Sequence, residues 1–288
     1  YYAKITSDKT TPMYSRATMQ QTAPGSTFKM ITAFAAMNEG AIGINDVIQT
    51  KGYFDKTETP AKCWIYPSAH GNINVSQAIQ HSCNYFFYEL GYRMATQDTG
   101  TYSDITGVER LQKYAGMFGF DSTSGIELPE SKPQISDADA IRTAIGQGTN
   151  NFTATQLARY VTTLANSGTC YDLSLVSEIK DINGNVVYKN EHKVHNQLDF
   201  PAEQWNVVRQ GMRQVVSVHT SSSALINQIN VAVAGKTGTA QQSDARPNHA
   251  LFVSFAPYEN PEVTVTSVIP FGYSSGNAVE LTGLVYAY

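Results

Sequence analysis

The stretch Ala23-Pro24-Gly25-Ser26-Thr27-Phe28-Lys29-Met30 places two reactive side chains where a loop becomes a helix. Pro24-Gly25 interrupts any preceding element, and apolar residues at helical spacing follow, so we expect a helix over about 26–38. Ser26 then lies in the first turn, near unpaired N–H groups, and Lys29 lies one turn further on the same face. An amine whose pKa is lowered by burial or by nearby positive charge can take the proton of a serine hydroxyl. The stretch therefore predicts a nucleophilic serine with an amine as its base.

A second Ser-x-x-Lys pattern, Ser177-Glu178-Ile179-Lys180, tests how much this spacing means by itself. It lies between β-rich flanks that join at Asn183-Gly184, which is typical of a hairpin turn. Residues three apart in a strand point to opposite faces, so Ser177 and Lys180 cannot cooperate. Only the first copy predicts chemistry.

Composition limits the class of protein. The chain has 288 residues, of which 42% are hydrophobic and 15% charged, and this predicts a globular protein. The net charge of −4 and the absence of a basic run argue against a nucleic-acid partner. No apolar run reaches the length of about 18 residues that a membrane span needs, and there is no initiating Met, so we expect a fragment of a longer protein. Three cysteines are too few for a disulfide scaffold.

The order of the expected elements predicts an α+β fold in which helices pack on a mainly antiparallel sheet. Residues 41–74 are turn-rich and are predicted to form a long loop. Helical spacing predicts helices at 75–80, 85–90, 108–120, 153–166 and from 201 onward. A turn and a strand are expected within 119–130, a hairpin at 175–188, and three neighbouring antiparallel strands at 230–240, 249–256 and 262–269.

Two further short segments carry candidate chemistry. Ser82-Cys83-Asn84 lies at the junction of two expected helices, where the plainest interpretation of short polar side chains is a helix cap. Lys236-Thr237-Gly238 lies in an expected strand and places a cation and a hydroxyl beside a residue with no side chain. A substrate backbone could pair with that strand, although an exposed lysine on an edge strand is also common.

The order of these motifs along the chain indicates a family. Ser26-x-x-Lys29, Ser82-x-Asn84 and Lys236-Thr237-Gly238 are the three signatures shared by penicillin-binding proteins and class A β-lactamases. Nearly the whole chain resembles the transpeptidase domain of class B penicillin-binding proteins, of an elongation type like that of Gram-positive bacteria. The longer segments that carry this resemblance are Ala23–Lys29, Gly125-Ile126-Glu127-Leu128-Pro129, Ile145-Gly146-Gln147-Gly148, Thr155-Gln156-Leu157-Ala158 and Ala234–Gln241.

The resemblance implies a fold and a reaction. The fold would be that of penicillin-binding proteins and β-lactamases, with a helical lobe over about 41–170 and a sheet lobe formed by the rest of 1–288. The reaction would be that of a D,D-transpeptidase, which cross-links peptidoglycan stem peptides through a serine acyl-enzyme and is acylated and inhibited by β-lactams. No cofactor is needed for this chemistry.

The resemblance also implies a role for each site residue. Ser26 would be the nucleophile, Lys29 its base, and Ser82 a proton relay between the two lysines. Asn84 would bind the substrate amide. The strand residues Lys236, Thr237, Gly238 and Thr239 would bind the substrate, Lys236 and Thr237 through its carboxylate. The N–H groups of Ser26 and Thr239 would form the oxyanion hole.

The implied partners are stem peptides ending in D-Ala-D-Ala, β-lactams and, in the full-length protein, a membrane glycan polymerase. The implied location is the extracytoplasmic face of the bacterial cell membrane. Two alternatives on the same scaffold remain: a non-catalytic β-lactam sensor domain, and a serine β-lactamase or carboxypeptidase. The sequence lacks the Glu-x-x-Leu-Asn segment with which class A β-lactamases activate water, and this disfavours the hydrolase.

A metal site beside the catalytic residues is a further hypothesis. Cys63, His70 and Cys83 are ligands that zinc prefers, and Asp55 could supply a fourth, with Glu58 as its substitute. A structural zinc there would fix the long loop to the segment that contains Ser82 and Asn84. The alternatives are free thiols or a disulfide between Cys63 and Cys83. The third cysteine, Cys170, has no expected partner and is assigned a structural role.

Overall fold

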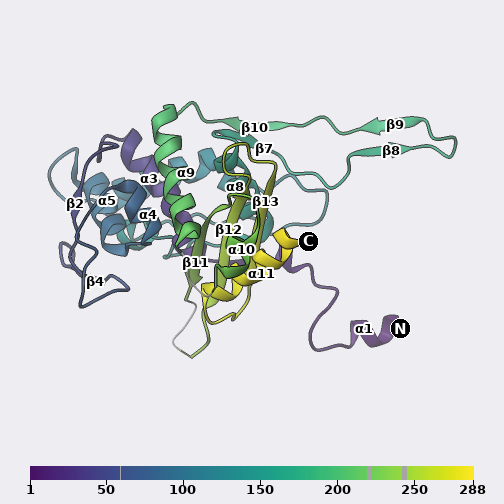
Figure 1. The fold of residues 1–288 in the computed structure, drawn as a ribbon, viewed down its shortest axis with the longest axis horizontal. Coiled ribbons are helices and arrows are strands. Elements are labelled where there is room, and N and C mark those ends of the chain that lie inside the picture. The colour runs from purple at the N-terminus through teal and green to yellow at the C-terminus, as the bar shows by residue number, and fades with distance from the viewer. Residues whose placement is uncertain (59, 219–221, 242–244) are drawn as a thin grey trace.

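An antiparallel sheet of three strands forms the centre of the structure, with helices on both sides (Figure 1). The computed structural model describes residues 1–58, 60–218, 222–241 and 245–288. The strand order is β11 (Ala234–Ala240), β12 (His249–Ala256) and β13 (Val263–Ile269), and every pairing is antiparallel. The three strands predicted at the end of the chain are therefore confirmed, with the first beginning four residues later than expected.

The central strand β12 is buried along its whole length. Alternate residues face opposite sides, and Leu251, Val253 and Phe255 belong to the main hydrophobic core. Ala250, Phe252 and Ala256 belong to a smaller core that includes residues of α11 (Ser275–Ala287). A strand covered on both faces has a nearly continuous apolar sequence, and His249–Ala256 has that composition.

The helix predicted after Pro24-Gly25 begins as a single 3₁₀ turn, η1 (Gly25–Phe28), and continues as α3 (Lys29–Asn38). All residues from Lys29 to Met37 are buried. The helix is thus buried all round, whereas the sequence predicted one apolar side. It packs among α5 (Asn84–Thr96), α6 (Asp104–Ala115) and α9 (Ala202–Ser217). Consequently the amine of Lys29 lies inside the protein.

Most of the other elements are short, whereas α8 (Ala154–Ala165) belongs to the main core and packs on β12 and β13. The predicted loop over 41–74 contains two small strand pairs, and its last residue, Asn74, caps the following helix through a capping box with Gln77. The remaining described elements are α1 (Tyr2–Thr6), α2 (Arg16–Met19), β1 (Gln21–Thr22), β2 (Ile48–Gln49), β3 (Tyr53–Phe54), β4 (Ala61–Lys62), β5 (Asn72–Ile73), α4 (Val75–Gln80), η2 (Gly116–Phe120), α7 (Ala140–Thr143), β6 (Phe152–Thr153), α8 (Ala154–Ala165), β7 (Thr169–Tyr171), β10 (Val194–Gln197) and α10 (Ala224–Gln228).

The strand predicted within 119–130 is wrong, since the structure has no strand across those residues. Hydrogen bonds to a side chain hold this segment in place, rather than pairing between strands. The Glu130 carboxylate accepts hydrogen bonds from the backbone N–H of Ser124 at 2.6 Å and from the hydroxyl of Thr153 at 2.9 Å. It also accepts one from Thr155. A carboxylate that joins two distant segments in this way makes strand pairing unnecessary.

The predicted hairpin is confirmed as β8 (Glu178–Lys180) and β9 (Val186–Lys189). Figure 1 shows that it forms an arm that projects far from the body of the protein. All residues of the two strands are exposed, as is Ser177 at the base of the arm. The second Ser-x-x-Lys pattern therefore lies far from any buried amine.

Among the described residues, no helix combines the length and the hydropathy required to cross a lipid bilayer.

Candidate active site

Ser26 is the accessible residue of an otherwise buried turn. It is partly exposed, whereas Gly25, Thr27 and Phe28 around it are buried. Gly25 has a φ of +52°, and a Cβ at this position would lie 2.4 Å from the carbonyl oxygen of Thr239. Only glycine fits such a contact in the left-handed region. The turn thus presents the serine hydroxyl while its backbone packs directly against β11.

The amine of Lys29 reaches the start of α5 from the middle of the core. Its Nζ donates hydrogen bonds to the carbonyl oxygen of Ser82 at 2.8 Å and to Oδ1 of Asn84 at 2.6 Å. Nζ also lies 3.2 Å from the Oγ of Ser82 and 5.5 Å from the centre of the Phe87 ring. The cap interpretation is wrong: the N-cap of α5 is Cys83, without a side-chain cap bond, and Ser82 and Asn84 instead hold a buried amine.

The second lysine approaches the same hydroxyl from the sheet. Lys236 of β11 is fully buried, and its Nζ donates to the Oγ of Ser82 at 3.0 Å and to the carbonyl oxygen of Thr237 at 2.9 Å. The Ser82 hydroxyl consequently lies between two amines that come from opposite ends of the chain. The structure brings Lys29, Ser82, Asn84 and Lys236 together one turn from Ser26, as the motif order leads one to expect.

Burial governs the charge of both amines. Desolvation lowers the pKa of Lys29 from 10.5 to about 7, and the nearby thiols Cys63 and Cys83 oppose this shift. Burial also places the pKa of Lys236 well below its usual value, and the charge of Lys29 lowers it further. The sequence argument named burial and nearby positive charge as causes, and loss of water is the larger cause at each lysine. A neutral amine is thus available near neutral pH to accept a proton.

The free edge of β11 faces the serine turn. A Cβ at Gly238 would lie 2.8 Å from the carbonyl oxygen of Pro24, so the strand and the turn are in close contact. In an antiparallel strand the N–H and C=O of one residue point to the same edge. Because the carbonyl of Thr239 points toward Gly25, its N–H also faces the turn, on the side where Ser26 lies. The side chains of Thr237 and Thr239 remain accessible, and Gly238 is buried.

A residue to which sequence reasoning gave no role, Gln147, holds this edge in place. Its Nε2 donates to the carbonyl oxygen of Thr239 at 3.3 Å. The preceding residue, Gly146, accepts a hydrogen bond from the N–H of Gly25 at 3.0 Å. The Ile145–Gly148 segment therefore joins the serine turn to β11. The only signal in the sequence was an amide side chain between two glycines.

Three of the predicted metal ligands also meet. The Sγ of Cys63 lies 3.9 Å from Nδ1 of His70 and 4.0 Å from the Sγ of Cys83, and all three ligand atoms lie within 4.8 Å of one another. Both thiols are buried, and the Nε2 of His70 is buried without a hydrogen-bond partner. Two thiols and an imidazole nitrogen thus form a group of three side chains that could hold a metal ion.

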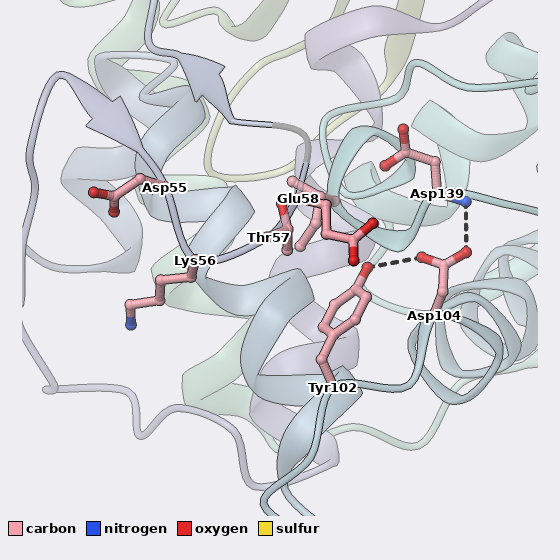
Figure 2. Close-up of a pocket in the computed structure, with 8 residues that line it drawn as sticks. Asp55, Lys56, Thr57, Glu58, Tyr102, Asp104 and Asp139 are labelled. Carbon is pink, nitrogen blue, oxygen red and sulfur yellow. Dashed lines mark hydrogen bonds between the residues drawn. The ribbon is translucent and has the colours of Figure 1, made fainter.

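Asp55 and Glu58 do not join this group. They lie beyond the opposite end of the β3–β4 pair, whereas Cys63 adjoins Gly52 at the near end. Both line a separate pocket of about 630 Å³ with Lys56, Tyr102, Asp104 and Asp139. Figure 2 shows the Asp55 carboxylate pointing away from Glu58 and Tyr102, and Tyr102 bound to Asp104 at 2.7 Å. The expected fourth ligand is therefore not supplied by either acid.

The fold and the site together define a class: α+β proteins with an accessible serine beside two buried lysines. The family described as "Penicillin binding protein transpeptidase domain" matches residues 2–281. The chain belongs to this family, as its resemblance in sequence implied.

Individual relatives agree with this assignment. The chain is 29% identical to the peptidoglycan D,D-transpeptidase MrdA of Haemophilus influenzae, over the whole chain and 47% of that protein. It is 27% identical to penicillin-binding protein 2B of Streptococcus pneumoniae, over 89% of the chain and 41% of that protein. It therefore spans about half the length of the curated relatives it matches.

Solved structures share the fold. A complex of penicillin-binding protein PBP2 with MreC from Helicobacter pylori superposes with a TM-score of 0.81 at 24% identity, covering 99% of this chain and 52% of that one. The imipenem acyl-enzyme of penicillin-binding protein A from M. tuberculosis superposes with a TM-score of 0.82 at 23% identity. The match covers 99% of this chain and 64% of that one. A peptidoglycan synthase complex that coordinates polymerization and crosslinking superposes with a TM-score of 0.82 at 26% identity. The match covers 99% of this chain and 48% of that one. The predicted fold class is confirmed.

The lowered pKa of Lys29 predicts how acylation of Ser26 by a β-lactam depends on pH. We propose the neutral amine of Lys29 as the base, so the rate should rise with pH and level off above the pKa of about 7. A single group with that pKa gives a rise of about tenfold between about pH 6 and pH 8. The rate is measured by intact mass at limiting β-lactam, with Ser26→Ala as the blank. A rate that is flat or falls over this range would show that Lys29 is not the base.

Removing the Gln147 side chain should slow acylation. Gln147→Ala loses an uncharged hydrogen bond of about 0.5–1.5 kcal/mol, which corresponds to a rate loss of roughly two- to tenfold if the bond orients the Thr239 peptide. The matched control is Gln97→Ala, which removes a hydrogen bond from the side-chain amide of Gln97 to the carbonyl oxygen of Glu39. Equal acylation rates in the two variants would contradict a role for Gln147.

Proposed function

We propose that this domain is the catalytic part of a D,D-transpeptidase that cross-links peptidoglycan stem peptides through an acyl-enzyme on Ser26. The observation that carries the proposal is the Ser82 hydroxyl, which lies 3.2 Å from the amine of Lys29 and 3.0 Å from that of Lys236. This arrangement can pass a proton between two groups that are buried beside the accessible serine. Membership of the transpeptidase family supports the same reaction.

In the first step Ser26 would attack the carbonyl carbon of the peptide bond between the two terminal D-alanines. Lys29 takes the hydroxyl proton as the new C–O bond forms, and the carbonyl electrons move onto its oxygen. The N–H groups of Ser26 and Thr239 would stabilise that oxyanion. As the C–N bond breaks, the proton reaches the departing amine of D-alanine through Ser82, and an ester on Ser26 remains.

In the second step an amine of another stem peptide would attack the ester carbonyl and form an amide bond. The C–O bond to Ser26 breaks, and the proton that the amine loses passes through the same groups to the Ser26 oxygen. Asn84 would hold the amide of the donor peptide while its Oδ1 accepts from Lys29. The Lys236 amine is turned toward Ser82, so the accessible hydroxyls of Thr237 and Thr239 are better placed to meet the substrate carboxylate. Gly238 is buried against the serine turn, so Thr237 and Thr239 on either side of it are the strand residues left to meet the peptide.

We propose a structural zinc ion at Cys63, His70 and Cys83. The support is their close approach and the donor set, two thiols and an imidazole, with the fourth ligand supplied by water or by a further group. Cys83 lies between Ser82 and Asn84 in the sequence, so a metal there would order the segment that holds Lys29. The ion would take no part in the acyl transfer.

The cellular location and the partners of the complete protein are inferred from its relatives. We propose that the complete protein is anchored at the extracytoplasmic face of the cell membrane and serves cell elongation together with a glycan polymerase. The relative named MrdA and the structures of PBP2 with MreC and of a synthase complex support this assignment. The net charge of −4 gives no support to a nucleic-acid partner.

The proposed function predicts a covalent β-lactam adduct on one serine. Intact mass should show one adduct on the wild type and none on Ser26→Ala, because Ser26 is the proposed nucleophile and the Ser82 hydroxyl is already bound by both amines. Ser177→Ala is the matched control, since it removes the serine of the second Ser-x-x-Lys pattern and should react like wild type. A stable adduct together with cross-linking of stem peptides supports a transpeptidase. Rapid loss of the adduct would favour a hydrolase, and a stable adduct without cross-linking a sensor.

The zinc proposal predicts about one equivalent of zinc in the purified protein, measured by elemental analysis. Cys63→Ser should lose the metal and unfold at a lower temperature, because metal binding contributes to folding. Cys170→Ala removes the third buried cysteine and should keep the metal. Metal-free wild type whose melting temperature is unaffected by a chelator would refute the site and favour free thiols or a disulfide.

A further inference from the structure

Three large aromatic side chains are exposed on the loop that precedes α4. Trp64 is 64% exposed, Tyr66 47% and Tyr53 39%. The other tryptophan of the chain, Trp205, is 4% exposed and belongs to the main core. Soluble proteins seldom leave several large rings in contact with water unless the rings bind something.

Trp64 is held in place despite its exposure. Its Nε1 donates to the carbonyl oxygen of His81 at 3.1 Å, and its ring centre lies 5.5 Å from that of His70. His70 in turn stacks on His81, with ring centres 5.3 Å apart. A ring fixed in this way loses little rotamer entropy when a ligand covers it, so the indole is preorganised for binding.

The two tyrosines form the adjoining part of the same loop. Their ring centres are 6.0 Å apart, and the Nζ of Lys62 lies 4.8 Å from the centre of the Tyr66 ring. Tyr53 and Lys62 are direct partners across the β3–β4 pair. Tyr66 also follows Trp64 by two residues. We refer to Tyr53, Lys62, Trp64 and Tyr66 as the aromatic loop surface.

The aromatic loop surface is connected to the catalytic residues. Trp64 bonds to His81, and the next residue is Ser82, whose hydroxyl lies between the two amines. Other exposed rings, such as Tyr14, Tyr188 and Tyr273, lie on segments that contribute no residue to the site. A molecule bound to this surface would therefore lie beside the segment that carries Ser82.

We propose that the aromatic loop surface binds the amino-sugar backbone of the glycan strand whose stem peptide enters the active site. This inference rests on the proposed transpeptidase function, because stem peptides are attached to such strands. Aromatic faces carry partial negative charge and attract the C–H groups on the face of a sugar ring. Stacked nucleobases are the other common occupant of such rings, but they require a basic surface that a chain with a net charge of −4 does not offer. The ammonium group of Lys62 can meet a carboxylate at the base of the stem peptide.

The chain contains its own probe for this binding, because Trp64 is exposed and Trp205 is not. Wild-type protein is titrated with soluble N-acetylglucosamine oligomers and, separately, with glycan strands from which an amidase has removed the peptides. Tryptophan emission should shift and saturate. In Trp64→Phe, where Trp205 is the remaining fluorophore, the ligand should leave the emission unchanged.

A matched pair of tyrosines tests the surface without changing the fluorophore. Tyr66→Leu should weaken glycan binding by about fivefold or more, as expected for the loss of an aromatic contact of about 1 kcal/mol. Tyr188→Leu removes a ring of similar exposure, 46%, from the projecting arm and should bind like wild type. Tyr66→Leu and Tyr188→Leu should both still be acylated by a small β-lactam, which shows that their active sites are intact.

The outcomes separate the two proposals. If wild type is not acylated, the proposed function fails, whatever the titration shows. If wild type is acylated but its emission does not respond to either glycan, or Tyr66→Leu binds as tightly as wild type, the glycan surface is refuted. A change in emission on adding MreC, the partner in a solved relative's structure, but not on adding glycan would also refute the glycan surface.

Discussion

The site depends on one constraint: two amines must remain inside the protein, both within hydrogen-bond distance of the Ser82 hydroxyl. Charged lysines are costly to bury, so the interior lowers the pKa of each, and it is this desolvation that produces a base. The placement of Lys29 follows from α3, which is buried all round and leaves its amine no route to water. The placement of Lys236 follows from the edge strand β11. The Lys236 side chain is fully buried there, and its amine reaches the Ser82 hydroxyl just before α5. The core thus determines the chemistry as well as the stability.

A second constraint is the close approach of backbones around the serine. Gly25, Gly146 and Gly238 each lie where a Cβ would come within 3 Å of a neighbouring carbonyl oxygen. The turn, the Ile145–Gly148 segment and β11 can therefore meet without side chains between them. This contact aims the Thr239 N–H at the serine turn, and the amide of Gln147 fixes the carbonyl of the same residue. Small residues at the contact let the polar groups around the serine come from three separate parts of the chain.

The fold and most of the site could be predicted from the sequence because strong local patterns coincided with motifs in a fixed order. The strand at 249–256 is apolar throughout, and Ser26, Lys29, Ser82 and Lys236 belong to motifs whose order indicates the family. What could not be predicted depended on contacts between distant residues. The strand expected within 119–130 is replaced by bonds to Glu130, and Asp55 is carried away from the thiols by the register of a two-residue strand pair. Gln147 bonds to a backbone carbonyl, and a bond to the backbone produces no pattern of residue types that could be recognised in the sequence. The dominance of burial over charge repulsion likewise requires knowing that α3 is covered on every side.

The projecting arm has a consequence of its own. Its strands β8 and β9 are exposed on both faces, and a two-stranded hairpin without a core has little stability by itself. We therefore expect the arm to open as a separate unit, at a free energy below that of unfolding the whole domain. Its backbone amides exchange with solvent, and its tip is open to proteases, while β12 in the middle of the central sheet remains protected. The length of the arm can consequently change between related proteins without disturbing the buried amines.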